Sequence, residues 1–213
     1  RALKKELEND GGSVFRYASH ENSILNEIRK QLEQSDEKDK DALMGFIDTI
    51  THRGHTKKDK WVGHRDMIDL LKVVKSYFYA PSMKGSNSIK VVLPAVLRSK
   101  ELQKKYAKPY REYVQSDNFV GFDFSLINYN DNGEVGNPYK YLPAIGAESV
   151  NGATDRNDIL NNGGLANANY AKLQYDGLTN EEKLKLKNAL LRYCELDTMA
   201  MVLIYEFFKI DCK

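Results

Sequence analysis

The spacing of apolar residues along the chain predicts a helix-rich protein with few strands. Apolar side chains recur every three or four positions within residues 20–34, 42–50 and 64–79, as on one face of an α-helix. The β-rich run "SVFRYA" (13–18) directly precedes the first of these segments. One short strand cannot form a sheet. Either the chain is mostly helical, or it supplies the helices and one or two strands of a sheet whose other strands lie outside it.

The second half of the chain combines helical segments with a long loop-rich stretch. We expect a helix at "IKVVLPAVL" (89–97), kinked or stopped by Pro94, and an exposed helix over residues 99–115. Residues 116–163 are rich in Asn, Asp, Gly, Pro and Tyr, which indicates a functional loop or an insertion. Within it, "NFVGFDF" (118–124) is a candidate strand.

The composition is that of an ordinary globular protein, with 41% hydrophobic and 29% charged residues. The 32 Lys and Arg residues nearly balance 30 Asp and Glu residues, so only local clusters of charge can indicate a polyanionic partner. The two cysteines, Cys194 and Cys212, have no metal-binding spacing, which favours a reduced, cytoplasmic protein. No run of 18 apolar residues and no secretory leader is present, so we expect neither membrane insertion nor secretion.

The last helix carries a carboxylate on its apolar face. Its predicted start is a capping box formed by Thr179 and Glu182. Asp197 lies one turn after Tyr193 on the same apolar stripe. A carboxylate buried without a partner costs several kcal/mol, so Asp197 should be neutral, paired with a cation or bound to a metal. Tyr-x-x-x-Asp suits a metal ligand beside a phenol that positions a water, but an N–H or Arg partner, or rotation to solvent, is favoured on spacing alone.

Two further acids lie near predicted element ends. Glu21 begins the helix that follows "SVFRYA", at the kind of sheet edge where α/β proteins bind ligands. The helix dipole alone also favours an acid in a first turn, so both interpretations stay open. Asp69 lies four residues after Arg65 on the predicted 64–79 helix. It is either a third acid of the same site or, more simply, half of an Arg–Asp pair on the helix surface.

Two segments combine basic residues with aromatic ones. Residues 51–65 contain five Lys or Arg against one Asp, with Trp61 among them, and residues 98–111 contain six against one Glu, with two tyrosines interleaved. Such a mixture suits a phosphate backbone and stacked bases, although runs of charge are more often solvated faces. The predicted nucleic-acid contacts are Lys90, Arg98, Lys104, Lys105 and Lys108.

Five segments in order carry a resemblance to a known family. They are "VFRYASHENSIL", "RDMIDLLKVVKSYFYAPSMKGSNSIKVVLPAVL", "NPYKYLPAI", "NGGLANANYAKLQ" and "LLRYCELDTMAMV". Together they resemble a bacterial domain family of unknown function whose core is similar to the ribonuclease-H-like exonucleases of the DEDD group, named for four acidic residues. The resemblance implies metal-dependent 3′–5′ cleavage of DNA or RNA. Members of the family look fused to a RecB-like or Cas4-like nuclease domain, which would lie outside this chain.

The resemblance also assigns roles to individual residues. Tyr193 and Asp197 match the Tyr-x-x-x-Asp motif of the tyrosine-type exonucleases, in which Asp197 would bind a metal and Tyr193 would orient the attacking water. Glu21 takes the place of a second-motif acid that is usually Asp, and Asp69 matches an acid that recurs in this particular family. The expected cofactors are two Mg²⁺ or Mn²⁺ ions, for which carboxylate oxygens are suitable ligands.

The first motif of these exonucleases, an Asp-x-Glu on the first strand, has no counterpart at the expected position. "GFDFS" (121–125) resembles it, but it follows the second motif and has Ser125 where Glu is needed. We therefore expect the first strands of the sheet to lie upstream of this chain. The other interpretation is a degenerate, inactive member of the family.

Residues 1–213 are thus predicted to form one exonuclease-like domain of the α/β class, with a helix-rich ribonuclease-H-like fold and a loop-rich insertion at 116–163. The predicted function is that of a metal-dependent 3′–5′ exonuclease, nearly inactive in this chain because the first motif is missing. The alternative is a catalytically dead module that binds nucleic acid or protein. The sequence does not choose between DNA and RNA.

Overall fold

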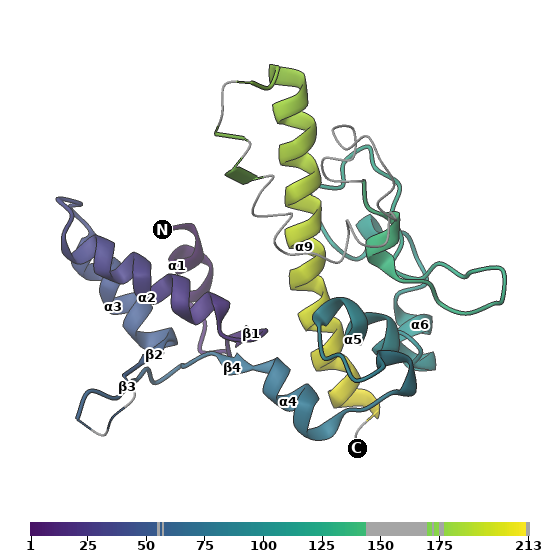
Figure 1. The fold of residues 1–213 in the computed structure, drawn as a ribbon, viewed down its shortest axis with the longest axis horizontal. Helices are drawn as coiled ribbons and strands as arrows, with labels where there is room; N and C mark the ends of the chain where they lie inside the picture. The colour runs from purple at the N-terminus through teal and green to yellow at the C-terminus, as the bar shows by residue number, and fades with distance from the viewer. Residues whose placement is uncertain (55, 57, 144–169, 172, 175–176, 212–213) are drawn as a thin grey trace. The chain divides into compact units, whose positions relative to one another are not determined.

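The structure is a computed structural model in which two compact units are distinguished, Arg1–Tyr79 and Ala80–Lys213 (Figure 1). The residues it describes are 1–54, 56, 58–143, 170–171, 173–174 and 177–211. Within this part of the chain the architecture is α/β and helix-rich, with two small two-stranded sheets. The coarse fold class predicted from the sequence is therefore confirmed.

The first unit contains four helices and both sheets. The helices are α1 (Ala2–Leu7), α2 (His20–Glu33), α3 (Lys40–Ile50) and α4 (Leu70–Tyr77). Helices α2 and α3 pack against each other, as their apolar periodicity predicts. The buried apolar side chains of this unit are Leu43, Ile47, Ile50, Met67, Leu70 and Val74.

One sheet of the first unit is parallel and directs two helices. Strand β1 (Phe15–Arg16) pairs with β4 (Ile68–Asp69), with Arg16 opposite Asp69. Helix α2 follows β1 after three residues, and α4 follows β4 at once, so both helices begin beyond the carboxyl ends of the paired strands. The prediction of a continuous helix over 64–79 is wrong in its first half. The side chains of Met67 and Leu70 are both buried, but the backbone between them is a strand.

The other sheet is a hairpin at the end of α3. Strand β2 (His52–Arg53) pairs antiparallel with β3 (Trp61–Val62), and His52 lies opposite Val62. Two backbone hydrogen bonds fix the segment after the hairpin to the last residues of α3, from Arg65 N to Thr49 O at 2.9 Å and from Met67 N to Ile50 O at 3.1 Å.

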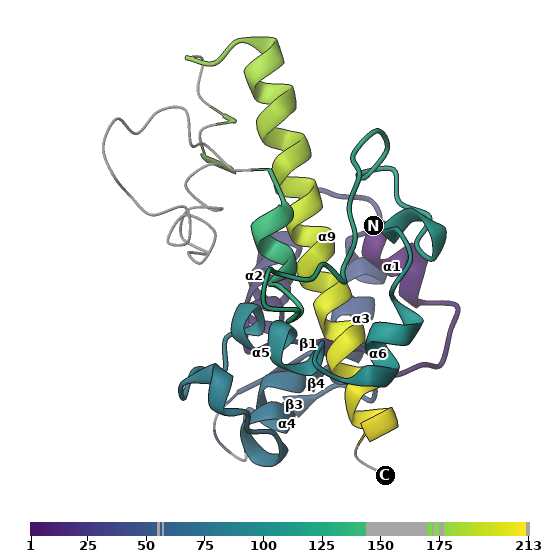
Figure 2. The same ribbon diagram turned by 90° about the vertical axis from the view of Figure 1, so that its right-hand side faces the viewer.

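The second unit is built on one long helix, α9 (Asn180–Asp211). Helices α5 (Ile89–Val96) and α6 (Lys100–Lys105) both pack against α9 (Figure 2). Three short 3₁₀ helices complete the described part of this unit: η1 (Pro81–Met83), η2 (Tyr110–Glu112) and η3 (Pro138–Tyr141). No described helix is both long enough and apolar enough to cross a membrane.

Helix α5 continues through Pro94 instead of stopping there. Proline has no N–H, so the carbonyl of Lys90, four residues earlier, loses its helical partner. The side chain of Asn137 replaces that partner, with Nδ2 donating to Lys90 O at 3.3 Å. A residue just before η3 thus compensates for the proline, and the helix keeps its buried face.

Two predictions in this unit need correction. The candidate strand at 118–124 is a series of turns, with Gly121 at φ +69 and Phe122 N donating to Phe119 O at 3.1 Å. Its apolar residues mark an aromatic cluster instead, in which Phe119 and Phe124 lie against Tyr110. The helix predicted over 99–115 ends at Lys105, and it is largely exposed as predicted, with Leu102 as its buried residue.

The start of α9 agrees with its predicted capping box. Thr179 N and Oγ1 donate to Glu182 Oε2 at 2.8 and 2.7 Å, and Glu182 N donates back to Thr179 Oγ1 at 3.3 Å. The predicted insertion at 116–163 is described only as far as residue 143. Turns and η3 predominate in that part, and the remainder lies outside the described residues.

Candidate functional site

The apolar stripe predicted on α9 is buried, and Asp197 lies on it. Tyr193 and Ala200, one turn to either side, are buried, while Asp197 is half-buried. The phenol of Tyr139, in η3, donates a hydrogen bond to Asp197 Oδ1 at 2.5 Å. The carboxylate therefore has a neutral donor from another element, and it is not simply rotated into solvent.

A buried lysine lies beside this carboxylate. Lys90 is only 6% exposed, and its ammonium lies 4.7 Å from the ring centre of Tyr193 and 5.9 Å from that of Tyr139. Burial lowers the pKa of Lys90, and the negative charge of Asp197 opposes this shift. Little of the Lys90 side chain is therefore accessible for the predicted contact with a nucleic acid.

Tyr193 keeps its proton at neutral pH. Burial raises its pKa above the ordinary tyrosine value, and the charge of Asp197 adds to the shift. Its ring centre lies 6.0 Å from that of Tyr139. Asp197 is thus accompanied by two tyrosines and a lysine, a group that could orient a carboxylate and a water-sized ligand.

Asp69 occupies a different environment, at the carboxyl ends of β1 and β4. Its Oδ1 accepts from Ala18 N and Leu71 N, both at 3.1 Å, and the second bond caps α4. Its Oδ2 lies 3.3 Å from the guanidinium of Arg16, and both side chains are buried. Protein donors therefore engage both oxygens of Asp69.

The predicted pairing of Asp69 with Arg65 is wrong. Arg65 instead donates to the backbone carbonyls of Leu7 and Gly12 and to the carboxylate of Asp10. It ties the segment before β1 to the segment before β4. A spacing of four residues brings two side chains together only within a helix. Residues 65–69 are not helical, because α4 begins at Leu70.

Glu21 differs from Asp69 in having an oxygen that no described residue satisfies. It lies in the first turn of α2, beyond the same strand ends, and its Oε2 is buried without a hydrogen-bond partner among the described residues. An orphaned carboxylate oxygen is costly unless a cation or another donor binds it. Of the three predicted acids, Glu21 is thus the one whose environment leaves a coordination position open.

Asp69 and Arg16 fix the turn that places Glu21. The peptide of Ala18 donates its N–H to Asp69, and the Ala18 carbonyl accepts from Arg16. Ala18 adopts a φ of +75, a conformation that costs a non-glycine residue roughly 1–2 kcal/mol. The buried ion pair therefore holds a strained turn between β1 and α2.

The structure does not assemble a complete metal centre. Among the residues it describes, no three His, Cys, Asp or Glu side chains lie close enough together to hold a metal. Glu21 and Asp69 belong to the first unit, and Tyr193 and Asp197 to the second.

Sequence reasoning missed a second carboxylate network on α9. Glu195 accepts hydrogen bonds from Tyr110 Oη (3.0 Å), Ser116 Oγ (2.8 Å) and Asn118 Nδ2 (2.7 Å). Its neighbourhood in the sequence, "YCELD", gave a signal, because two acids flank a buried leucine. Glu195 ties α9 to the loop after η2.

Most of the predicted basic contacts face carboxylates. Lys105 pairs with Glu206 at 2.7 Å. Two looser, exposed pairs join Lys108 to Glu112 at 3.8 Å and Arg98 to Glu134 at 3.9 Å. Lys104 is exposed. Three of the six cations in the segment 98–111 therefore face a carboxylate.

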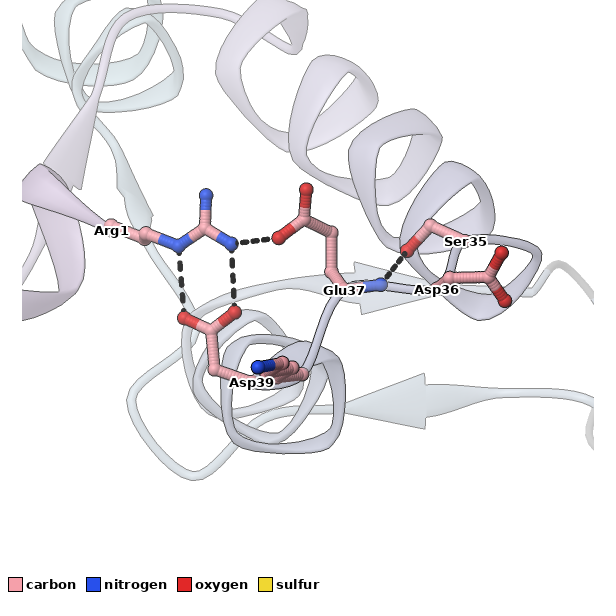
Figure 3. A pocket seen from close by; sticks show the side chains of 6 residues that line it. Arg1, Ser35, Asp36, Glu37 and Asp39 are labelled. Atoms are coloured by element: carbon pink, nitrogen blue, oxygen red, sulfur yellow. Dashed lines mark hydrogen bonds and ion pairs between the residues drawn. The ribbon is translucent and has the colours of Figure 1, made fainter.

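A pocket lies elsewhere in the first unit, and none of the predicted site residues lines it. Arg1 and the segment 35–39 form its walls, and the guanidinium of Arg1 reaches both Asp39 and Glu37 (Figure 3). The hydrogen bond from Arg1 lowers the pKa of Asp39. The exposed ion pairs explain the shape of this pocket without a ligand.

Comparison with known proteins supports part of the sequence prediction. Residues 1–88 match a family of unknown function. The matching family model is described as Domain of unknown function (DUF2779). No curated protein and no solved structure matches the chain. The matched span contains Glu21, Asp69 and both sheets, and it ends before Lys90 and α9.

Proposed function

We propose that the chain supplies part of a metal-dependent nuclease of ribonuclease-H-like fold, which hydrolyses phosphodiesters from the 3′ end of DNA or RNA. The observation that carries the proposal is the buried Oε2 of Glu21, which has no partner among the described residues and lies beyond the carboxyl ends of two parallel strands. The Tyr-x-x-x-Asp pair on the buried stripe of α9 supports it.

The residues present fit a divalent cation in part. Glu21 offers a carboxylate oxygen without a partner among the described residues, and Asp197 offers a half-buried carboxylate that Tyr139 orients beside Lys90. Mg²⁺ and Mn²⁺ prefer such oxygen ligands. Asp69 fits less well, because Arg16 and two backbone N–H groups engage it. Two ions need further oxygen ligands, which the Asp-x-Glu motif supplies in the exonucleases that the sequence resembles.

The chain's own residues would prepare this chemistry. When bound, the ions activate a water and stabilise the leaving oxygen. Tyr139 orients the carboxylate of Asp197 through its hydrogen bond. Tyr193, whose phenol stays protonated, can donate a hydrogen bond to the attacking water. The buried ion pair of Arg16 and Asp69 fixes the turn that carries Glu21.

The test is cleavage of a 5′-labelled single strand by the protein extended upstream of Arg1 to include an Asp-x-Glu motif, in the presence of Mn²⁺. We expect shortening from the 3′ end. Asp197→Asn and Glu21→Gln should each lower the rate at least about 100-fold, because each removes a metal ligand.

Two conservative changes on the same helices serve as controls. Glu27→Gln on α2 and Glu181→Gln on α9 alter exposed acids and should leave the rate within about twofold of the unmodified protein. Cleavage that persists unchanged in Asp197→Asn would overturn the proposal.

The alternative is a module that has lost the chemistry. It is favoured by the hydrogen bond from Tyr139, which by itself can account for a carboxylate on the buried stripe of α9. This version predicts that the extended protein binds single strands but does not shorten them with any divalent ion. The same assay therefore separates the two.

A further inference from the structure

We propose that the β2–β3 hairpin is a docking surface for single-stranded nucleic acid, on which Trp61 stacks against a base while Lys58 and Lys60 contact the adjacent phosphates. The proposal shares its class of ligand with the proposed function. It requires neither a metal nor cleavage, so the two can fail separately.

Trp61 is held in place although a large part of it faces solvent. Its Nε1 donates to the carbonyl of Asp48 at 2.9 Å, and the guanidinium of Arg53 lies 5.2 Å from its ring centre. Arg53 is in turn bound by the carboxylate of Asp48. The side chain nevertheless remains 43% exposed. A ring fixed in this way loses little conformational entropy when a base stacks on it.

The hairpin that carries Trp61 is closely packed against the end of α3. Gly54 has a φ of +79, and a Cβ at this position would lie 2.1 Å from Asp59 O. At Gly63, a Cβ would lie 2.2 Å from Thr49 O. Both positions require glycine. The strands therefore have one arrangement relative to α3, visible beside the β2 and β3 labels in Figure 1.

The charges around Trp61 favour an anionic ligand. Arg29 and Arg53 share the carboxylate of Asp48, and Glu33 lies 3.8 Å from Arg29, so these four charges balance. Lys58 and Lys60 are exposed on either side of Asp59. The described residues 56 and 58–60, which lead into Trp61, thus carry two lysines against one aspartate, a net charge of +1.

Single-stranded nucleic acid is the partner that uses both features. Stacking on an exposed aromatic ring needs an unpaired base, whose face a duplex hides. Phosphates spaced along the strand suit the two exposed lysines that precede the ring in the same hairpin. A folded protein partner would need a larger apolar patch than Trp61 and its exposed neighbour Val62 provide.

The test uses the fact that Trp61 is the only tryptophan in the chain. In EDTA, the protein is titrated with oligothymidylate and with oligouridylate of about 12 nucleotides while tryptophan fluorescence is recorded. We expect saturable quenching that weakens as salt is raised. The Lys58→Ala/Lys60→Ala variant should keep the starting fluorescence, bind roughly tenfold more weakly and show a smaller salt dependence.

Labelled oligonucleotides extend the test to the ring itself. By fluorescence anisotropy, Trp61→Ala should weaken binding roughly tenfold. Two matched controls lie on α4, where Lys72 and Lys75 are exposed lysines and Tyr77 is a 78% exposed aromatic residue. Lys72→Ala/Lys75→Ala and Tyr77→Ala should bind as the unmodified protein does.

Three outcomes would overturn the proposal. They are binding without quenching, equal weakening by the α4 control variants, and equal quenching by an acidic polymer without bases, which would indicate a polyanion surface with no stacking. Quenching only by a folded protein partner would also contradict it. Because no metal is present, loss or absence of nuclease activity does not affect the result.

Discussion

At the residue scale, Asp69 and Glu21 show how two acids at one sheet edge acquire different roles. Asp69 is surrounded by donors and balances a buried guanidinium, whereas Glu21 keeps an oxygen that has no partner in the described part of the chain. The backbone is strained at Ala18, which precedes Glu21 and donates its N–H to Asp69. We infer that Asp69 positions Glu21 and does not act as a ligand itself.

Removing the Asp69 carboxylate should therefore be costly. In Asp69→Ala the buried Arg16 loses its charge partner, and we expect a loss of about 3–5 kcal/mol in the free energy of unfolding. Asp69→Asn should cost less, because the amide oxygen can still accept from Ala18 and Leu71. Urea denaturation measures both, with the exposed Asp41→Ala as control. A free energy unchanged within about 0.5 kcal/mol in Asp69→Ala would contradict this role.

The sequence allowed the position of Asp197 to be predicted but not its partner. Helical periodicity is enough to place Asp197 and Tyr193 on a buried stripe, because both lie within one regular element. Tyr139 is 58 residues away in a loop-rich segment, and no local pattern connects the two. The same holds for Glu195, whose three donors come from a segment that forms no regular element except a short 3₁₀ helix.

At the scale of elements, helices with long apolar periods were predictable and two-residue strands were not. Helices α2 and α3 and the capping box before α9 agree with the sequence patterns. Strand β4 was missed because Met67 and Leu70, on either side of it, are buried at a spacing that also fits a helix. At 118–124 the positive φ of Gly121 breaks the alternation that a strand needs.

The β2–β3 hairpin should depend on the close backbone approach at Gly63. Gly63→Ala would place a methyl group against the Thr49 carbonyl, and we expect a loss of about 1–3 kcal/mol in the free energy of unfolding. The emission of Trp61 should also shift, because its indole is held by the neighbouring backbone. Gly45→Ala, in α3, is the control, since a Cβ there meets nothing within 4 Å. Equal stability of both variants would contradict the proposed packing.

The segment from α6 to η2 should make the second unit sensitive to alkali. Burial raises the pKa of Tyr106, Tyr110 and Tyr113 above the usual tyrosine value, and Glu206 and Glu195 add to the shifts of the first two. The folded state thus retains protons that the unfolded state releases above about pH 10. Their contribution to stability is complete below that pH and declines above it.

Urea denaturation between neutral pH and about pH 11 should show this decline, together with tyrosinate absorbance that rises mainly as the protein unfolds. Replacing all three tyrosines with Phe should remove much of the alkaline sensitivity. A stability that stays constant over this range would show that these phenols are accessible to solvent.

At the scale of the whole molecule, the predicted acids are distributed over both units. Glu21 lies in the span that matches the family of unknown function, and Asp197 lies outside it. Overall charge is nearly balanced, and three of the six cations in the basic segment 98–111 face a carboxylate. The proposed activity therefore rests on two carboxylates and their supports, and the proposed nucleic-acid contact on the hairpin.

The most direct measurement is Mn²⁺ binding to this chain, followed through the electron paramagnetic resonance signal of the free ion. The account predicts that the chain binds Mn²⁺ and that Glu21→Gln and Asp197→Asn each weaken binding roughly tenfold or more, while Glu27→Gln and Glu181→Gln do not. Binding by the unmodified chain that is no tighter than that of the Glu21→Gln/Asp197→Asn double variant would contradict it.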